Sequence, residues 1–208
     1  MAETSFPFEN VDVSEAQFGQ WASALAGSSG VIGVPGDGNL LVSGDNSGLQ
    51  VRVAAGKAIV RGHFYENTLQ TTVTIASAGT NTRIDAIVLE LDLVANSITA
   101  KAVQGTAVSS NPVAPTLTQT EVGLFQLLLG YVTIPNNTTS ITSGMVSDRR
   151  SFVGGRIGAW TTATRPANPV ANLSIGFNAT LGIHEIWNGT AWVSFAPDAP
   201  SMFLLMGA

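Results

Sequence analysis

Hydrophobic and polar residues alternate along much of the chain, and the longest run of this pattern extends from Arg83 to Val103. Its first half predicts a strand with two rows of side chains: Ile87, Leu89, Leu91 and Leu93 on one face, and Ile84, Ala86, Val88, Glu90 and Asp92 on the other. The turn-prone sequence Ala95-Asn96-Ser97 follows, and the alternation resumes at Ile98. The run therefore predicts a β-hairpin, around which we expect the rest of the domain to be organised.

The two strands of this hairpin bring a cation opposite a carboxylate. If Ala95 and Asn96 form a two-residue loop, Glu90 lies opposite Lys101, and a shift by one residue places Asp92 there instead. Such a pair stabilises a half-exposed strand by roughly a few tenths of a kcal/mol. Glu90 and Asp92 as a general acid and base, or as calcium ligands, are the less favoured alternative, because Lys101 already accounts for one carboxylate.

A single amphipathic helix is predicted near residues 14–26. Ser14 and Gln17 form a capping-box pattern, and the apolar residues that follow recur at helical spacing. The residues that share this apolar face are Phe18, Trp21, Ala22 and Leu25. We expect the face to be buried, with Trp21 in the core.

Shorter strand patterns fill the rest of residues 1–152. They predict strands at Leu40 to Ser43, at Thr71 to Ala76 and within Glu121 to Ile134, the last of them buried on both faces. A second hairpin is predicted from Leu49 to Arg61, with its turn at Gly56. The fold class is therefore mainly β: an antiparallel, hairpin-rich β-sandwich or barrel-like domain with one N-terminal helix.

Residues 153–208 are predicted to form a separate, small β module. Asn188-Gly189 between alternating apolar residues is a strong hairpin signal. This turn places Trp187 and Trp192 on one face, diagonal to each other. A hairpin of this size is too small to be stable alone, so we expect it to pack on the first domain, on its own copies or on a partner.

One structural ion-pair cluster is predicted in the first domain. Asp85 begins the strand face that carries the apolar row, where a carboxylate needs a partner, and Arg149 or Arg150 could supply one through a bidentate contact. The cluster comprises Arg83, Asp85, Asp148, Arg149 and Arg150. In the alternative interpretation, Arg149 and Arg150 are solvated residues at the exit of the domain.

Asp37 and Asp45 lie in Gly-rich turns, and we interpret them as turn residues rather than calcium ligands, with Asp37 exposed.

The composition restricts the possible partners. Only 11% of the residues are charged, nine are Lys or Arg, and the net charge is -5, which argues against a nucleic-acid-binding groove. The chain has no Cys and only two widely separated His residues, His63 and His184, so neither a thiol nucleophile nor a metal or other cofactor is expected.

A signal segment and an apolar run of about 18 residues are both missing, so we expect a soluble chain without membrane insertion. So few charges favour an oligomer.

The order of several motifs resembles the N-terminal region of tailed-bacteriophage baseplate, minor tail and tail-fibre proteins. The motifs are FPFENVDVSEAQFGQWASAL, LLVSGDNSGLQVRVAAGKAIVRGHFYEN, TRIDAIVLELDL, the LTQT segment after Pro112 and Pro115, and VSDRR, and they cover roughly residues 6–152. Residues 165–193 resemble a short module of tail-fibre and head-fibre chains, with Arg-Pro, then Gly, a strand and Asn-Gly-x-x-Trp. The resemblance implies a virion structural protein, usually trimeric, that joins the tail tip to adhesion parts, and it does not imply an enzyme.

Three functions remain open on this basis. The first is a structural subunit of a tail tip, baseplate or fibre, assembled in the host cytoplasm and acting as an adaptor that contacts its own copies and other tail proteins. The second is a carbohydrate-binding adhesin, in which Trp160, Trp187 and Trp192 stack on a host cell-surface glycan, although these indoles are also expected to pack the small module. A glycan-degrading enzyme is the least favoured, because Glu90 and Asp92 are the one carboxylate pair that the sequence presents.

Overall fold

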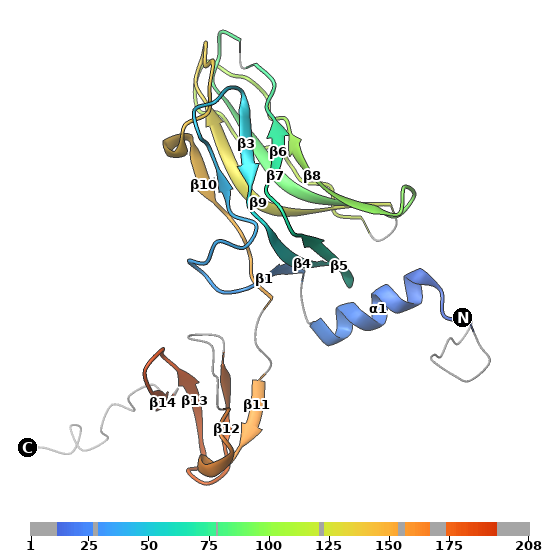
Figure 1. Cartoon of the computed structure of the whole chain (residues 1–208), viewed down its shortest axis with the longest axis vertical. Helices are drawn as coiled ribbons and strands as arrows, with labels where there is room; N and C mark the ends of the chain where they lie inside the picture. Colours follow the sequence, from blue (N-terminus) through green and yellow to red (C-terminus); the bar gives the residue numbers. More distant parts are fainter. Residues whose placement is uncertain are drawn as a thin grey trace, which may run out of the picture. The chain divides into compact units, whose positions relative to one another are not determined.

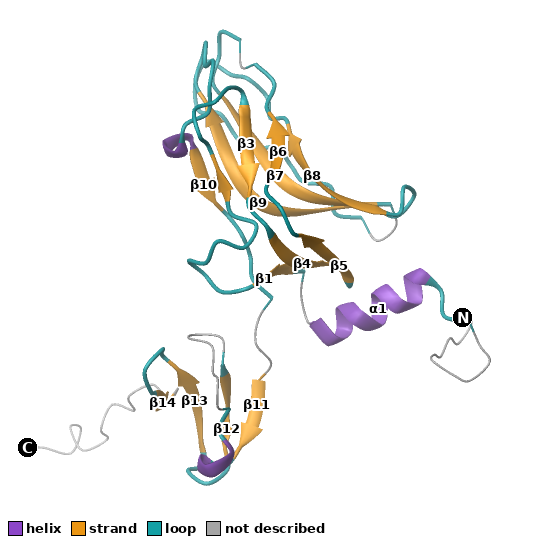
Figure 2. Ribbon diagram, viewed as in Figure 1, coloured by secondary structure: helices purple, strands orange, loops and turns teal. Residues whose placement is uncertain are grey.

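The computed structural model describes residues 12–26, 29–77, 79–120, 123–153, 157–166 and 174–194. The chain forms two compact units, which we call unit 1 (Met1–Val153) and unit 2 (Gly154–Ala208) (Figure 1). Strands dominate both units, and α1 is the one α-helix of the described residues (Figure 2). The predicted fold class, mainly β with one helix near the N-terminus, is confirmed.

Helix α1 (Glu15–Ala26) begins with the predicted capping box. The backbone N–H of Gln17 donates to Ser14 Oγ at 3.3 Å, and the backbone N–H of Ser14 donates to Gln17 Oε1 at 2.9 Å. The predicted burial of the apolar face is wrong, because Phe18 is 56% exposed and Trp21 is 48% exposed. The face of α1 that packs on a β-hairpin of the same unit instead carries small residues such as Gly19, as described below.

Two packed sheets enclose the core of unit 1. The larger sheet has the strand order β10-β9-β7-β8, and the smaller has the order β2-β3-β6. Their strands are β7 (Arg83–Asp92), β8 (Ser97–Val103), β9 (Leu124–Ile134) and β10 (Val146–Asp148), and β2 (Val42–Ser43), β3 (Gln50–Val53) and β6 (Thr71–Thr74). Val51 and Val53 of the smaller sheet join Ile87, Leu89 and Leu129 of the larger sheet in one cluster of buried residues. In Figure 1, β3 lies across the larger sheet. Of the two architectures that the sequence left open, unit 1 therefore adopts the sandwich.

A third sheet, with the order β1-β4-β5, contributes Val31, Ala58 and Val60 to the same core. Its strands are β1 (Gly30–Ile32), β4 (Gly56–Val60) and β5 (His63–Asn67). The predicted hairpin from Leu49 to Arg61 is wrong, because β3 pairs with β2 and β6 whereas β4 pairs with β1 and β5.

The hairpin in this region is formed by β4 and β5, and its turn is Arg61-Gly62. Both residues have positive φ, 48° and 78°, as a two-residue turn between twisted strands requires. Gly56 does not turn the chain. A Cβ at Gly56 would lie 2.7 Å from the backbone nitrogen of Leu40, so the glycine allows two segments to pack closely.

The central hairpin of β7 and β8 forms as predicted, but in neither predicted register. Glu90 lies opposite Thr99 rather than Lys101, because the loop spans residues 93–96. Asp92 stabilises this longer loop by accepting hydrogen bonds from two of its backbone N–H groups. Lys101 Nζ nevertheless contacts Glu90 Oε1 at 2.5 Å from the diagonal position, so the predicted ion pair forms without the predicted register.

Unit 2 contains one four-stranded sheet with the order β11-β12-β13-β14. Its strands are β11 (Ile157–Trp160), β12 (Ile175–Asn178), β13 (Ile183–Trp187) and β14 (Trp192–Ser194), and a 3-10 turn (Thr162–Thr164) follows β11. The β11–β12 pair is parallel, and the other two pairs are antiparallel. The predicted β13–β14 hairpin therefore belongs to a larger sheet of its own unit, which the sequence analysis did not foresee.

The register of the β13–β14 hairpin also differs from the prediction. Trp187 and Trp192 lie directly opposite each other rather than diagonally. The connecting loop is residues 188–191, and the side chain of Asn188 holds it by accepting hydrogen bonds from the backbone N–H groups of Thr190 and Ala191. The Asn-Gly signal thus marked the turn correctly but not its length.

Candidate functional site

The predicted ion-pair cluster of unit 1 is two separate sites. Arg83 and Asp85 pair with each other, whereas Arg150 pairs with Asp148 and with Asp37. The predicted contact between Asp85 and Arg149 or Arg150 is therefore wrong. Residues two apart on a strand point to the same face, so the partner of Asp85 was already present on its own strand.

The Arg83–Asp85 pair is buried, with 2% and 1% of the two side chains exposed. Arg83 Nε donates to Asp85 Oδ1 at 2.7 Å, and Arg83 Nη2 donates to Asp85 Oδ2 at 3.1 Å, which makes the pair bidentate. The guanidinium also donates to the backbone carbonyls of Ala76 and Ser77, and Asp85 Oδ1 accepts from the backbone N–H of Gly105 at 2.9 Å. The pair therefore joins β7 to the segment that follows β6 and to the segment that follows β8.

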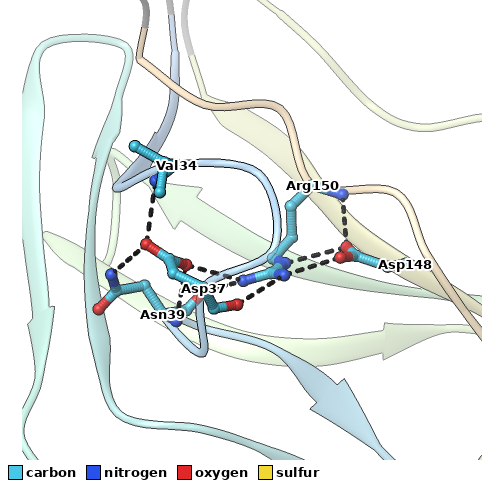
Figure 3. Close-up of polar contacts among 5 residues, drawn as sticks. All are labelled: Val34, Asp37, Asn39, Asp148 and Arg150. Carbon is cyan, nitrogen blue, oxygen red and sulfur yellow. Dashed lines mark hydrogen bonds and ion pairs between the residues drawn. The ribbon is translucent and has the colours of Figure 1, made fainter. Parts of the chain in front are cut away.

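The guanidinium of Arg150 lies between Asp37 and Asp148 (Figure 3) and is 1% exposed. Nε and Nη2 donate to the two carboxylate oxygens of Asp148 at 2.9 and 2.7 Å. Nη1 donates to the carbonyl oxygen of Asn39 at 2.5 Å, and Nη2 donates to the carbonyl oxygen of Asp37 at 3.1 Å. Asp37 and Arg150 are 113 positions apart in the chain. Arg150 therefore closes unit 1 by fastening its last segment to an early loop.

Asp37 is a turn residue, as predicted, but its side chain is only 23% exposed and belongs to this site, so the predicted exposure is wrong. Its Oδ2 accepts hydrogen bonds from the Val34 N–H at 2.9 Å and the Asn39 side-chain amide at 2.7 Å, and its Oδ1 accepts from the Asn39 N–H at 3.0 Å. Burial alone would raise the pKa of Asp37, but these hydrogen bonds and the charge of Arg150 outweigh it and lower the pKa below 3.8. The hydrogen bond from Arg150 is the main cause of the lowered pKa of Asp148. Both carboxylates are thus ionised partners of one buried cation.

Arg149 remains outside both sites. It is exposed, and its guanidinium lies 5.8 Å from the centre of the Tyr131 ring. Its backbone N–H donates to the carbonyl oxygen of Leu129 at 3.0 Å. For Arg149, the alternative of an exposed residue at the exit of the domain is the better description, whereas Arg150 is buried.

Glu90 and Asp92 do not form a joint acid–base site. Glu90 is held by Lys101 and by Gln126, whose Nε2 donates to Glu90 Oε2 at 2.8 Å. The hydrogen bond from Lys101 is the main cause of the lowered pKa of Glu90. Asp92 instead accepts hydrogen bonds from the hairpin loop. Each carboxylate therefore has its own structural partners.

The three tryptophans that were candidates for glycan or partner contact form one aromatic cluster in unit 2. The ring centre of Trp192 lies 4.9 Å from that of Trp160 and 5.7 Å from that of Trp187, with the planes inclined by 59° and 58°. All three residues are partly buried. Tilted contacts of this kind stabilise packed aromatic pairs. The cluster is therefore arranged for packing within the sheet.

A buried carboxylate that the sequence analysis missed lies beside this cluster. Glu185 Oε1 accepts hydrogen bonds from Trp160 Nε1 at 2.6 Å, Arg165 Nε at 2.8 Å and Asn178 Nδ2 at 3.1 Å, and Oε2 accepts from Arg165 Nη2 at 2.7 Å. The side chain is 1% exposed. The hydrogen bonds from Arg165 above all lower the pKa of Glu185 from 4.5 to about 2. Glu185 therefore holds β11, β12 and β13 together from one face of the sheet.

A signal for this network was present in the sequence. Arg165 opens the Arg-Pro motif of the module, and Glu185 is the one carboxylate on the strand Ile183–Trp187. Alternation along that strand also places Glu185 on the same face as Trp187. Within residues 165–193, Arg165 is the one cation and Glu185 the one carboxylate, so they are candidates for a pair.

The sites described above join segments of the chain, and their polar groups are occupied in doing so. Among the described residues, no group of three His, Cys, Asp or Glu side chains is placed to hold a metal ion. In the same part of the chain, no helix is long and apolar enough to cross a membrane. No protein-family model matches the sequence, and no curated protein matches it either.

Proposed function

We propose that this chain is a structural subunit of a bacteriophage tail tip, baseplate or fibre. It acts there as an oligomeric adaptor, a homotrimer, between the tail and the host-adhesion components, and it has no catalytic role. Its partners are its own copies and other tail or baseplate proteins in the virion, without nucleic acid. The order of the motifs across residues 6–152 and the Arg-Pro to Asn-Gly-x-x-Trp pattern of residues 165–193 support this assignment.

The main support for the proposal is that the buried polar side chains make contacts within the chain. The side chains of Arg83, Asp85, Arg150 and Glu185 are almost fully buried. Each joins its own strand or segment to another part of the chain, over separations from 6 to 113 positions. A catalytic group must remain accessible to a substrate, whereas these groups are buried and form hydrogen bonds and ion pairs within their own unit. Such contacts suit a subunit that bears load in an assembly.

The adhesin is supported less well. A glycan-stacking platform needs an indole face that is open to the sugar, but Trp192 packs against both Trp160 and Trp187. Trp160 also commits its N–H to Glu185. These contacts favour a role for the cluster in holding unit 2 together.

Immunogold labelling tests the proposal. Gold-conjugated antibodies against the purified chain are expected to bind one end of the tail on intact particles and to leave tail-less heads unlabelled. Light scattering of the purified chain should give about three times its mass of 21.5 kDa. Particles that lack the chain would overturn the proposal, and tight glycan-array binding that Trp187→Ala abolishes would establish the adhesin instead.

A further inference from the structure

Helix α1 has two opposite faces with different residues. One face packs on the β4–β5 hairpin. Gly19 lies against the imidazole of His63, and a Cβ on Gly62 would overlap the carbonyl oxygen of Gly19 and approach the backbone nitrogen of Ser23 at 2.8 Å. The small residues of α1 and the glycine of the β4–β5 turn therefore let the helix approach the sheet closely. This contact fixes the rotation of the helix about its axis.

The other face carries the large apolar side chains. Phe18 and Trp21 are exposed and lie in contact, with their ring centres 5.9 Å apart, and Leu25 is 46% exposed. Their spacing of three and then four residues is that of the a and d positions of a coiled coil. We call Phe18, Trp21 and Leu25 the α1 seam. On a helical wheel, Gly19 and Ser23 lie on the side opposite to this seam.

We propose that the α1 seam packs against the same seam of other copies of this chain, in a parallel bundle of α1 helices. This inference rests on the proposed function only for the number of helices, three. The three-four spacing does not by itself name the partner, but it allows identical helices to interlock, because every apolar layer of one helix can meet the same layer of the next.

The charges on α1 also fit a second copy better than a charged partner. Gln17, Ala22 and Ala24 flank the seam and are neutral, and Glu15 is the one charged residue of the helix. The carboxylate of Glu15 faces His63 of the same chain, with Glu15 Oε1 3.4 Å from His63 Nε2. Identical helices can therefore meet along the seam without placing like charges opposite each other. A charged partner helix, by contrast, would find no row of opposite charges on α1 to pair with.

The first test is the mass of the intact chain in solution, measured by light scattering at micromolar concentration. The double variant Phe18→Glu/Trp21→Glu places two charges in each seam, and its mass is expected to fall from about three chains to about one. The matched control Leu69→Glu/Val94→Glu adds the same charge at residues that are 76% and 87% exposed, and it should keep the wild-type mass. Circular dichroism verifies that both variants remain folded.

The second test uses the absence of cysteine from the chain. In a parallel bundle the copies of residue 18 share one layer, so the single variant Phe18→Cys should form a disulfide between chains under mild oxidation. Leu69→Cys should remain largely uncrosslinked at the same concentration. A monomeric wild-type chain, a double glutamate variant of unchanged mass or a Phe18→Cys variant that does not crosslink would each overturn the inference.

The failure of this inference can be told apart from the failure of the proposed function. If the double glutamate variant keeps its mass and still enters particles, the seam is not the contact between copies, but the function stands. If it keeps its mass but no longer enters particles, the seam binds a different tail protein, and the inference of self-association is wrong. If wild-type particles lack the chain, the proposed function falls whatever the mass measurements show.

Discussion

A buried charge organises each unit, but in contrasting surroundings. In unit 1, the cation Arg150 gathers acceptors from two distant segments, beside a continuous cluster of buried apolar side chains. In unit 2, the anion Glu185 gathers donors from Trp160, Arg165 and Asn178. Among residues 159–166 and 174–194, where exposure is described, no apolar side chain is fully buried.

The contrast shows that a buried, paired charge contributes differently to the stability of the two units. Apolar burial contributes most of the free energy of folding, so unit 1 has a large reserve beyond its ion pairs. A small unit buries less of its surface, and unit 2 relies on half-buried indoles around one carboxylate. Loss of a buried charge should therefore weaken unit 1 but disrupt unit 2.

The largest energetic effect is expected at the Arg83–Asp85 pair. Asp85→Ala leaves the buried guanidinium of Arg83 without its carboxylate, so it should lower the free energy of unfolding of unit 1 by about 3 to 5 kcal/mol. The sandwich should still form, because the apolar core is intact. Urea unfolding followed by far-UV circular dichroism measures this change. Glu66→Ala, which removes an exposed ion pair with Lys57, is the control and should cost less than about 0.5 kcal/mol. A similar cost for both variants would show that the buried pair does not stabilise unit 1.

Glu185→Gln is expected to have a comparable energetic effect but a more severe structural one. The pKa of Glu185 is lowered from 4.5 to about 2, which corresponds to stabilisation on the order of 3 kcal/mol at 1.36 kcal/mol per pKa unit. Unit 2 should lose its packed indoles, seen as a red shift of tryptophan fluorescence and loss of the near-UV circular dichroism signal. His184→Gln, an exposed neighbour on the same strand, should leave both signals unchanged. Intact signals in Glu185→Gln would show that the indoles pack without the carboxylate.

Acid should weaken unit 2 through the same residue. Because the pKa of Glu185 is about 2 in the folded chain and 4.5 ordinarily, its stabilisation is complete above about pH 4.5 and is lost as the pH falls toward about 2. The thermal midpoint of the tryptophan signal should therefore decline over this range in the wild type. In Glu185→Gln this part of the decline should be absent. Identical pH profiles for the two proteins would contradict the assignment.

The smallest of these effects is expected at Asp37. Asp37→Ala removes acceptors for Val34, Asn39 and Arg150, but Asp148 and two backbone carbonyls still hold the guanidinium. We expect a loss of about 1 to 2 kcal/mol in the free energy of unfolding of unit 1, measured with urea. Asp12→Ala, at an exposed position, should cost less than about 0.5 kcal/mol. Equal values for the two variants would mean that Asp37 is only a turn residue.

Local patterns in the sequence predicted most of the secondary structure. The alternation from Arg83 to Val103 gave the central hairpin, and the capping box gave the start of α1. Strand β9 lies within the predicted apolar run, with residues on both faces buried along much of its length. These features depend on neighbours in the chain, and such neighbours are visible in the sequence.

Pairings between distant segments could not be predicted in the same way. Strands β3 and β4 follow each other closely in the chain but enter different sheets, because Gly56 serves close packing and the turn falls at Arg61-Gly62. The loops of the β7–β8 and β13–β14 hairpins are longer than two residues, because Asp92 and Asn188 stabilise wider turns with their side chains. The exposed face of α1 was missed because a helical apolar stripe indicates burial without indicating the partner.

The candidate sites show the same limit. Asp85 pairs with Arg83, two residues away on the same strand, rather than with the predicted cation at the end of the domain. The contact between Arg150 and Asp37 spans 113 positions, and Glu185 meets Arg165 through strands whose order the sequence did not reveal. The pairing of Arg150 with Asp37 follows the arrangement of the strands, so it could be recognised only after the sheets were known.

Differential scanning calorimetry of the intact chain at neutral pH, wild type against Glu185→Gln, tests the contrast between the units most directly. We expect two transitions in the wild type, because the chain forms two compact units. In Glu185→Gln the smaller transition, from unit 2, should move to a lower temperature or disappear while the larger one stays in place. A single transition, or equal shifts of both, would contradict the claim that unit 2 depends on its buried carboxylate and unit 1 on its apolar core.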